Sequence, residues 1–225
     1  MAIPAPSTTK ISSDPDWTTG DFTVVTSNNV SFKVHDYQLF ATSVQFATAK
    51  SMTEAGTSVH ANVIHFDDAT LETAEVFRTF LKFATTLLPP MDLPVPSLGS
   101  LLLFLRKWEC DALEALMVRT FRHGLLIGDL RPFKVFRVGA WVDDIEICKL
   151  TLTMKVRVLV AHKDRIEDNL VPQEWAPSLW KLFDGSYIYA LTKSLHNPSL
   201  RPQEFEEHYL DYRKCEKEAE SPYLE

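Results

Sequence analysis

The sequence predicts an α+β fold, in which a small sheet capped by helices is followed by an all-helical region. Residues 21–25 and 30–34 are rich in β-branched and aromatic side chains, as strands are. Asn28 and Asn29 lie between the two runs, and asparagine tolerates the positive φ of a tight hairpin turn. Residues 36 to about 49 are compatible with one helix that places Leu39, Ser43 and Phe46 on one face, and farther along the chain apolar residues recur at helical spacings in several more segments.

Charge and cysteine content restrict the function classes. The 225 residues carry a formal net charge of -7, whereas phosphate binding requires clustered Lys and Arg, so direct nucleic-acid binding is not expected. The three cysteines lie far apart in the sequence, which favours free thiols in a reducing compartment over a disulfide framework.

The N-terminal segment and the apolar runs argue against export and membrane insertion. Residues 1–16 are rich in Pro, Ser and Thr and lack a signal-peptide pattern, so we expect a disordered lead. The longest apolar run, residues 101–105, is too short to cross a bilayer. We therefore expect a cytoplasmic and/or nuclear protein without a membrane partner.

A third strand and a helix are expected next. Residues 62–66 form an apolar run without clean alternation, which predicts a strand buried on both faces. Residues 67–70 predict a turn, with Thr70 opening a helix. The core-facing stripe of that helix consists of Val76, Phe77, Phe80, Leu81 and Ala84.

Prolines divide this helix from the next. Those between residues 88 and 96 exclude a helix there, because each removes a donor and constrains its predecessor. Ser97 is the expected N-cap of a helix through Trp108 that is apolar nearly all round, so it is either the central core helix or has one side facing a partner. Another helix is expected from Asp111 to about residue 123, ended by Gly124.

Residues 126–214 predict a helical C-terminal extension, and residues 215–225 an acidic tail that frays. The expected features, in chain order, are a first-turn proline at Pro132, an Asp143-x-x-Glu146 capping box, a charged loop over residues 162–169, a helix over residues 179–195 that Asp184-Gly185 interrupts, and a last helix from about Pro202 with Phe205, Tyr209 and Tyr212 on one face.

Six residues near the start follow one another in a set order: Asp21, Phe32, His35, Leu39, Ser43 and Phe46. Their order resembles the opening of a BTB/POZ domain, which reads Asp-x-x-Val, a turn, Phe-x-x-His, then Leu and Ser-x-x-Phe. The resemblance covers residues 17–125, and the sequence is similar in its overall style to the BTB proteins common in fungi. Where the family has a Tyr-Thr-Gly-like turn after its Phe-Leu-x-Phe helix, this chain has Ala84-Thr85-Thr86, which leaves the end of that helix open.

The resemblance implies a fold that holds proteins together and performs no chemistry. His35, paired with Asp21, is then structural, and a buried hydrogen bond between them would fix the hairpin to the first helix. Met52-Thr53-Glu54 is similar to the hydrophobic-x-Glu triplet with which BTB adaptors contact a cullin scaffold, so Met52 and Glu54 are the expected partner-binding residues. An ordinary exposed loop is the alternative interpretation of this triplet.

These observations favour a non-enzymatic protein–protein interaction module that forms homo- or hetero-oligomers. In its finer version the chain is a substrate adaptor of a cullin-based ubiquitin ligase. The alternatives are a BTB scaffold that recruits co-repressors in transcriptional regulation, and a small hydrolase or transferase. No catalytic, cofactor-binding or metal-binding residue is predicted, because no nucleophile lies beside a base, no glycine spacing forms a phosphate loop, and the adjacent acidic pairs suit helix starts.

Overall fold

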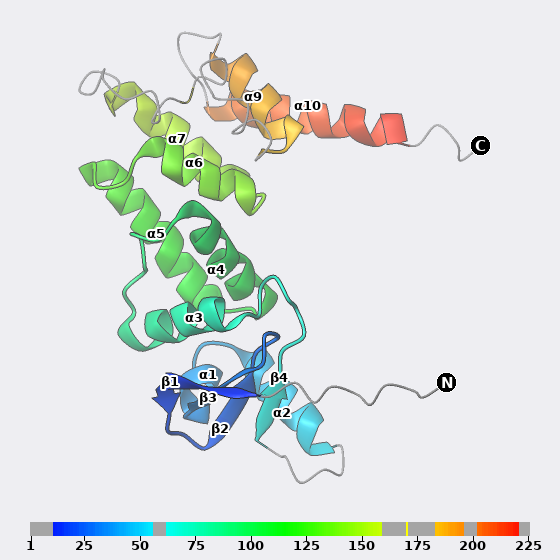
Figure 1. Ribbon diagram of the computed structural model, residues 1–225. Helices are drawn as coiled ribbons and strands as arrows, with labels where there is room; N and C mark the ends of the chain where they lie inside the picture. Colours follow the sequence, from blue (N-terminus) through cyan, green and yellow to red (C-terminus); the bar gives the residue numbers. More distant parts are fainter. Residues whose placement is uncertain (1–10, 56–61, 159–169, 171–182, 196–201, 221–225) are drawn as a thin grey trace, which may run out of the picture. The chain divides into compact units, whose positions relative to one another are not determined.

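The computed structural model describes residues 11–55, 62–158, 170, 183–195 and 202–220 (Figure 1). The chain divides into two compact units. One unit contains residues 1–93 and 100–117, and the other contains residues 94–99 and 118–225. The fold is mixed α+β, with one small sheet and a majority of helix, as the sequence predicts. The predicted boundary after residue 125 falls inside helix α5 (Asp111–Ile127), whereas the first unit ends at Met117.

The first unit is built on a four-stranded sheet with the strand order β1-β3-β2-β4. The strands are β1 (Ser12–Thr18), β2 (Phe22–Val25), β3 (Val30–Val34) and β4 (Val63–His65). Strands β2 and β3 are antiparallel, while β1 runs parallel to β3 and β4 parallel to β2. The sheet thus has an edge strand drawn from the N-terminal segment and another drawn from the middle of the chain.

The predicted hairpin is confirmed. Strands β2 and β3 pair over Phe22–Val25 and Val30–Val34, and Asn29 adopts the left-handed φ of 61° in the turn. The Thr26 hydroxyl donates to the Val30 carbonyl at 3.0 Å, which closes the turn. The Asn28 side-chain oxygen accepts the N–H of Ala74 at 2.9 Å, so the same turn also holds the start of the next long helix.

The predicted disordered lead is wrong over residues 12–16, which belong to strand β1; residues 1–10 lie outside the described part. The sequence gives β1 no apolar alternation, and most of its side chains are exposed. The strand is held instead by a buried carboxylate, Asp14, that pairs with Arg78. A contact between residues this far apart in the chain leaves no local signal.

Two helices occupy the stretch that the sequence predicts as one. Helix α1 (Asp36–Phe40) stops before Ser43, and helix α2 (Val44–Ala55) begins directly after it. The Thr42 hydroxyl donates to the Leu39 carbonyl at 2.6 Å, and the Ser43 hydroxyl oxygen accepts the N–H of Gln45 at 2.9 Å. The Ser43 hydroxyl thus serves as a side-chain acceptor at the start of α2, as a helix N-cap does, which allows a new helix to begin there.

Strand β4 and helix α3 (Ala74–Thr86) differ in detail from the prediction. Only Ile64 of β4 is buried, because His65 lies on the face of the sheet that also carries exposed Lys33. Helix α3 begins at Ala74 rather than at Thr70, with Thr73 as its N-cap. Of the predicted stripe, Phe77, Phe80 and Leu81 are buried, whereas Val76 and Ala84 are half-buried. Phe83, which the predicted stripe did not include, is buried as well.

The next two helices also begin or end at other residues than the sequence predicts. Helix α4 (Val95–Lys107) includes Pro96, so Ser97 is not its cap; a proline is tolerated in a first turn, where its missing N–H has no helical partner. Helix α5 continues through Gly124 to Ile127. A Cβ on Gly124 would lie 2.7 Å from the Leu130 side chain, so this glycine allows close packing and does not end the helix.

The described part of the second unit also contains helices α6 (Pro132–Trp141), α7 (Ile145–Val158), α9 (Gly185–Leu195) and α10 (Pro202–Glu220). Pro132 occupies the first turn of α6, as predicted. The core cluster of the second unit consists of Phe133, Phe136, Cys148, Leu152, Leu170, Tyr187, Ala190, Leu191 and Phe205. The unit therefore has a core of its own.

Other predictions for this region need correction. Asp144, rather than Asp143, caps α7 by accepting the N–H of Ile147 at 3.0 Å. Helix α9 begins at Gly185, within the stretch predicted as one helix over residues 179–195, while residues 162–169 and 179–182 lie outside the described residues. The predicted frayed tail is wrong over residues 215–220, which are helical in α10.

Candidate protein-interaction site

Four of the six residues that carry the sequence resemblance lie in the core of the first unit. Phe32, Leu39 and Phe46 are fully buried, and Ser43 is nearly so. The Ser43 hydroxyl donates to the backbone carbonyl of Trp108, which ties the junction of α1 and α2 to the end of α4. The Phe46 ring stacks on the Trp108 indole, with centroids 4.4 Å apart.

The other two, Asp21 and His35, lie at the surface, so the expected buried hydrogen bond is wrong. The His35 Nδ1 and Asp21 Oδ1 atoms are 3.7 Å apart, and more than half of each side chain is exposed. Asp21 Oδ1 instead accepts the backbone N–H of Asp36 at 3.0 Å, and this bond lowers the pKa of the Asp21 carboxyl. The hairpin is therefore attached to α1 through a backbone amide and not through the imidazole.

The structure places Met52 and Glu54 in the last turn of helix α2, so the interpretation of this triplet as a loop is wrong. The described residues give the backbone here, and the two side chains lie outside the description. Whether the triplet binds a partner stays a prediction.

Sequence reasoning missed a buried carboxylate in the first unit. Glu72 is 2% exposed. Its Oε1 accepts from Lys107 Nζ at 3.0 Å and from Trp108 Nε1 at 3.1 Å. Its Oε2 accepts the N–H groups of Asp67 and Asp68 at 3.0 and 2.8 Å. Four donors thus satisfy this carboxylate, which links the turn after β4 to the end of α4.

A pocket of about 420 Å³ opens on the first unit. Its lining comes from α1 and its C-terminal end, from the end of α3, and from the start of α5: Tyr37, Gln38, Ala41, Thr42, Ala84, Thr85, Leu87, Ala112 and Leu113. Ala84 and Thr85 belong to the stretch in which the sequence departs from the BTB pattern. No local sequence signal brings these three segments together.

The two threonine hydroxyls at this pocket donate to backbone carbonyls three or four residues earlier in the chain. Thr42 donates to the Leu39 carbonyl at 2.6 Å, and Thr85 donates to the Leu81 carbonyl at 2.8 Å. Their methyl groups, with the alanine and leucine side chains, make the walls largely apolar. Such a pocket suits an aliphatic side chain of a binding partner better than a polar small molecule.

Leu87 at the edge of this pocket has an unusual backbone. It caps α3 in the left-handed conformation, with φ of 55°, and its side chain is 58% exposed. Glycine or asparagine is the usual residue at a left-handed helix end, because a bulky side chain is disfavoured there. Tyr37, which also lines the pocket, is 64% exposed, and Leu88, the residue after Leu87, is 73% exposed. The chain thus presents apolar surface where neither stability nor solubility requires it.

Cys110 interacts with Thr42, one of the residues that line the pocket. Burial raises the pKa of the Cys110 thiol to about 12, so that it stays protonated. Among the residues that the structure describes, no group of three His, Cys, Asp or Glu side chains is arranged to hold a metal ion. None of the described helices combines the length and apolarity needed to cross a bilayer.

Comparisons with protein-family models, with curated proteins and with solved structures found no match for this chain.

Proposed function

We propose that this chain is a non-enzymatic protein–protein interaction module, and that it binds partners through the surface formed by α1, the end of α3 and the start of α5. The observation that carries the proposal is Leu87, an exposed leucine held in a left-handed conformation beside an apolar pocket. Residues with costly backbone conformations concentrate at functional sites. The BTB/POZ resemblance of the sequence agrees with a binding role, in the cytoplasm and/or nucleus.

Leu87→Asn tests this function. Asparagine suits the left-handed backbone and removes the apolar side chain, so the fold persists while partner capture from a eukaryotic lysate weakens. Leu126→Asn is the matched control, because Leu126 is similarly exposed but belongs to the second unit. Equal capture by the wild type and Leu87→Asn would contradict the proposal.

In the finer version of the proposal, the partner is a cullin scaffold and the chain is a substrate adaptor. It rests on Met52 and Glu54 in the last turn of α2. A pull-down with Glu54→Lys should lose the cullin, whereas Glu75→Lys, an exposed glutamate on α3, should keep it. The adaptor role would be excluded if the wild type recovered no cullin, or if the Glu54→Lys and Glu75→Lys variants recovered equal amounts. The broader binding function would still be tested by the Leu87→Asn experiment.

Oligomerisation belongs to the same proposal, with a second copy or another chain as the partner. A light-scattering mass above that of one chain at micromolar concentration supports self-association. If the mass falls in Leu87→Asn, the second copy binds at the pocket surface.

A further inference from the structure

Strand β1 is joined to the sheet in an uncommon way. It lies at the sheet edge and pairs in parallel with β3, with the partners Ser12↔Val30, Ser13↔Ser31 and Thr18↔Lys33. The register is irregular between Ser13 and Thr18, where Pro15 has no N–H to donate. Backbone pairing alone therefore holds this strand weakly.

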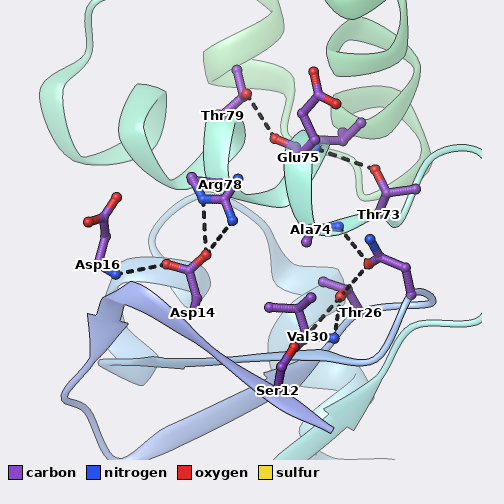
Figure 2. A network of polar contacts seen from close by, with 12 residues as sticks. Ser12, Asp14, Asp16, Thr26, Val30, Thr73, Ala74, Glu75, Arg78 and Thr79 are labelled. Carbon is purple, nitrogen blue, oxygen red and sulfur yellow. Dashed lines mark hydrogen bonds and ion pairs between the residues drawn. The ribbon is translucent and has the colours of Figure 1, made fainter. Parts of the chain in front are cut away.

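Side-chain packing adds one strong contact. Asp14 is the buried residue of β1, and Arg78 of α3 donates to its Oδ2 from Nε at 2.9 Å and from Nη2 at 2.5 Å (Figure 2). Asp14 Oδ1 accepts the N–H of Asp16 at 3.0 Å, and the Arg78 guanidinium lies 5.9 Å from the centroid of the Phe32 ring. A buried carboxylate that loses its cation is strongly destabilised, so docking of β1 depends on this pair.

Another side chain of β1 opposes docking. The indole Nε1 of Trp17 is buried and has no hydrogen-bond partner in the part of the chain that the structure describes. A donor left in this state costs about 1–3 kcal/mol. The Asp14–Arg78 pair, which we call the latch, works against that cost.

The connection from β1 to β2 passes over the end of β3. Gly20 has a φ of 151°, and a Cβ at this position would lie 2.2 Å from the carbonyl carbon and oxygen of Val34. Only three residues separate β1 from β2. The short, tight crossing keeps β1 beside the β3 strand of its own chain.

We propose that β1 is an intrachain strap that covers the outer edge of β3, and that the Asp14–Arg78 latch keeps it closed. When the latch opens, the backbone N–H and C=O groups along that edge of β3 become available to a strand from a second copy of the chain. Pro15 and the buried charge of Asp14 in turn make β1 itself a poor template for further strands. This inference does not depend on the pocket surface and goes beyond the proposed function.

A disulfide trap tests the intrachain position. Ser13 and Ser31 are register partners with their hydroxyl oxygens 3.4 Å apart, so Ser13→Cys with Ser31→Cys should form a disulfide. Cys215, which is exposed, is replaced by Ser to prevent unrelated cross-links. The strap predicts an oxidised single chain of faster mobility on a non-reducing gel. A disulfide-linked dimer would show that β1 sits on another copy, and no disulfide would show that β1 does not lie on β3; either result overturns the proposal.

Opening the latch tests its role. Arg78→Met leaves Asp14 buried without its cation, and amide exchange over residues 12–18 and 30–34 should become about 100-fold faster. The light-scattering mass should rise with concentration above that of the wild type. Asp14→Arg combined with Arg78→Asp should restore protection. Arg106→Met, which breaks the 2.8 Å pair with Glu114, is the control that leaves β1 and β3 protected. Unchanged exchange in folded Arg78→Met would overturn the latch.

Discussion

Leu87 combines two costs at one position. A left-handed backbone disfavours a branched side chain, and solvent exposure removes the gain from burying it. Leu88 is equally apolar and even more exposed, yet it is not among the residues with positive φ. The pair therefore separates the conformational cost from the cost of apolar exposure.

Leu87→Gly should raise the free energy of unfolding by about 1 kcal/mol, because glycine adopts the left-handed conformation without a steric penalty. The midpoint of urea unfolding measures this change. Leu88→Gly is the matched control and should lower the midpoint or leave it unchanged. If both variants shift the midpoint alike, backbone strain at Leu87 is not the cause.

Glu72, unlike Leu87, stabilises the fold, because each of its carboxylate oxygens accepts from two donors. Glu72→Ala should lower the free energy of unfolding by about 3–5 kcal/mol, because it leaves the Trp108 indole and two backbone amides without their acceptor and Lys107 with Asp68 as its remaining partner. Urea unfolding again provides the measurement. Glu75→Ala, exposed in the first turn of α3, should cost under about 1 kcal/mol; a comparable loss in both would contradict the role of the Glu72 network.

Among the elements, the turn before α3 gives the fold a dependence on pH. Asp68 accepts from the Thr70 hydroxyl and from the N–H groups of Thr70 and Leu71, and these bonds hold the pKa of its carboxyl well below the usual range. A carboxyl with a depressed folded-state pKa stabilises the fold above its unfolded value, near 3.8, and this stabilisation is lost as the pH falls further.

Asp68→Asn should therefore flatten the decline in stability on acidification below about pH 4. The urea midpoint measured at successive pH values from neutral to acid checks this. Asp92→Asn, an exposed residue in the loop before α4, should leave the wild-type slope in place. A slope that is the same in Asp68→Asn and the wild type would show that the turn does not carry the dependence.

Elements defined by neighbouring residues could be predicted from the sequence, and those defined by distant partners could not. The hairpin, three of the five residues of the α3 stripe, and the proline of α6 follow from turn chemistry and periodicity within a few residues. The junction of α1 and α2 depends in part on the Trp108 carbonyl, 65 residues away, and β1 depends on Arg78, 64 residues away. The pocket joins three segments from separate parts of the chain, so its lining could not be predicted.

At the scale of the whole molecule, each unit has its own hydrophobic core. Phe80 contacts Phe46, Phe77 and Phe104 in the first unit, and Phe136 belongs to the cluster of α6, α7, α9 and α10 in the second. Both phenylalanines are fully buried. A cavity made in one core should thus lower the opening free energy of the amides chiefly in that unit.

Phe80→Ala should lower the opening free energy of amides in β2, β3 and α3 by about 3–5 kcal/mol, and Phe136→Ala should do the same in α6 and α9. Hydrogen exchange followed by mass spectrometry distinguishes the two patterns, and each variant serves as the control for the other. Equal changes across both units from either substitution would show that the cores open together.

The rate at which each buried cysteine is alkylated reports the opening of the unit to which it belongs. Cys110 lies in the first unit and Cys148 in the second, and burial raises the pKa of both thiols, so neither reacts while its unit is closed. Cys215 is exposed and is alkylated at once. The times at which the second and third alkyl groups appear, read by mass spectrometry of cysteine peptides, then report how often each unit of the native protein opens, without any mutation.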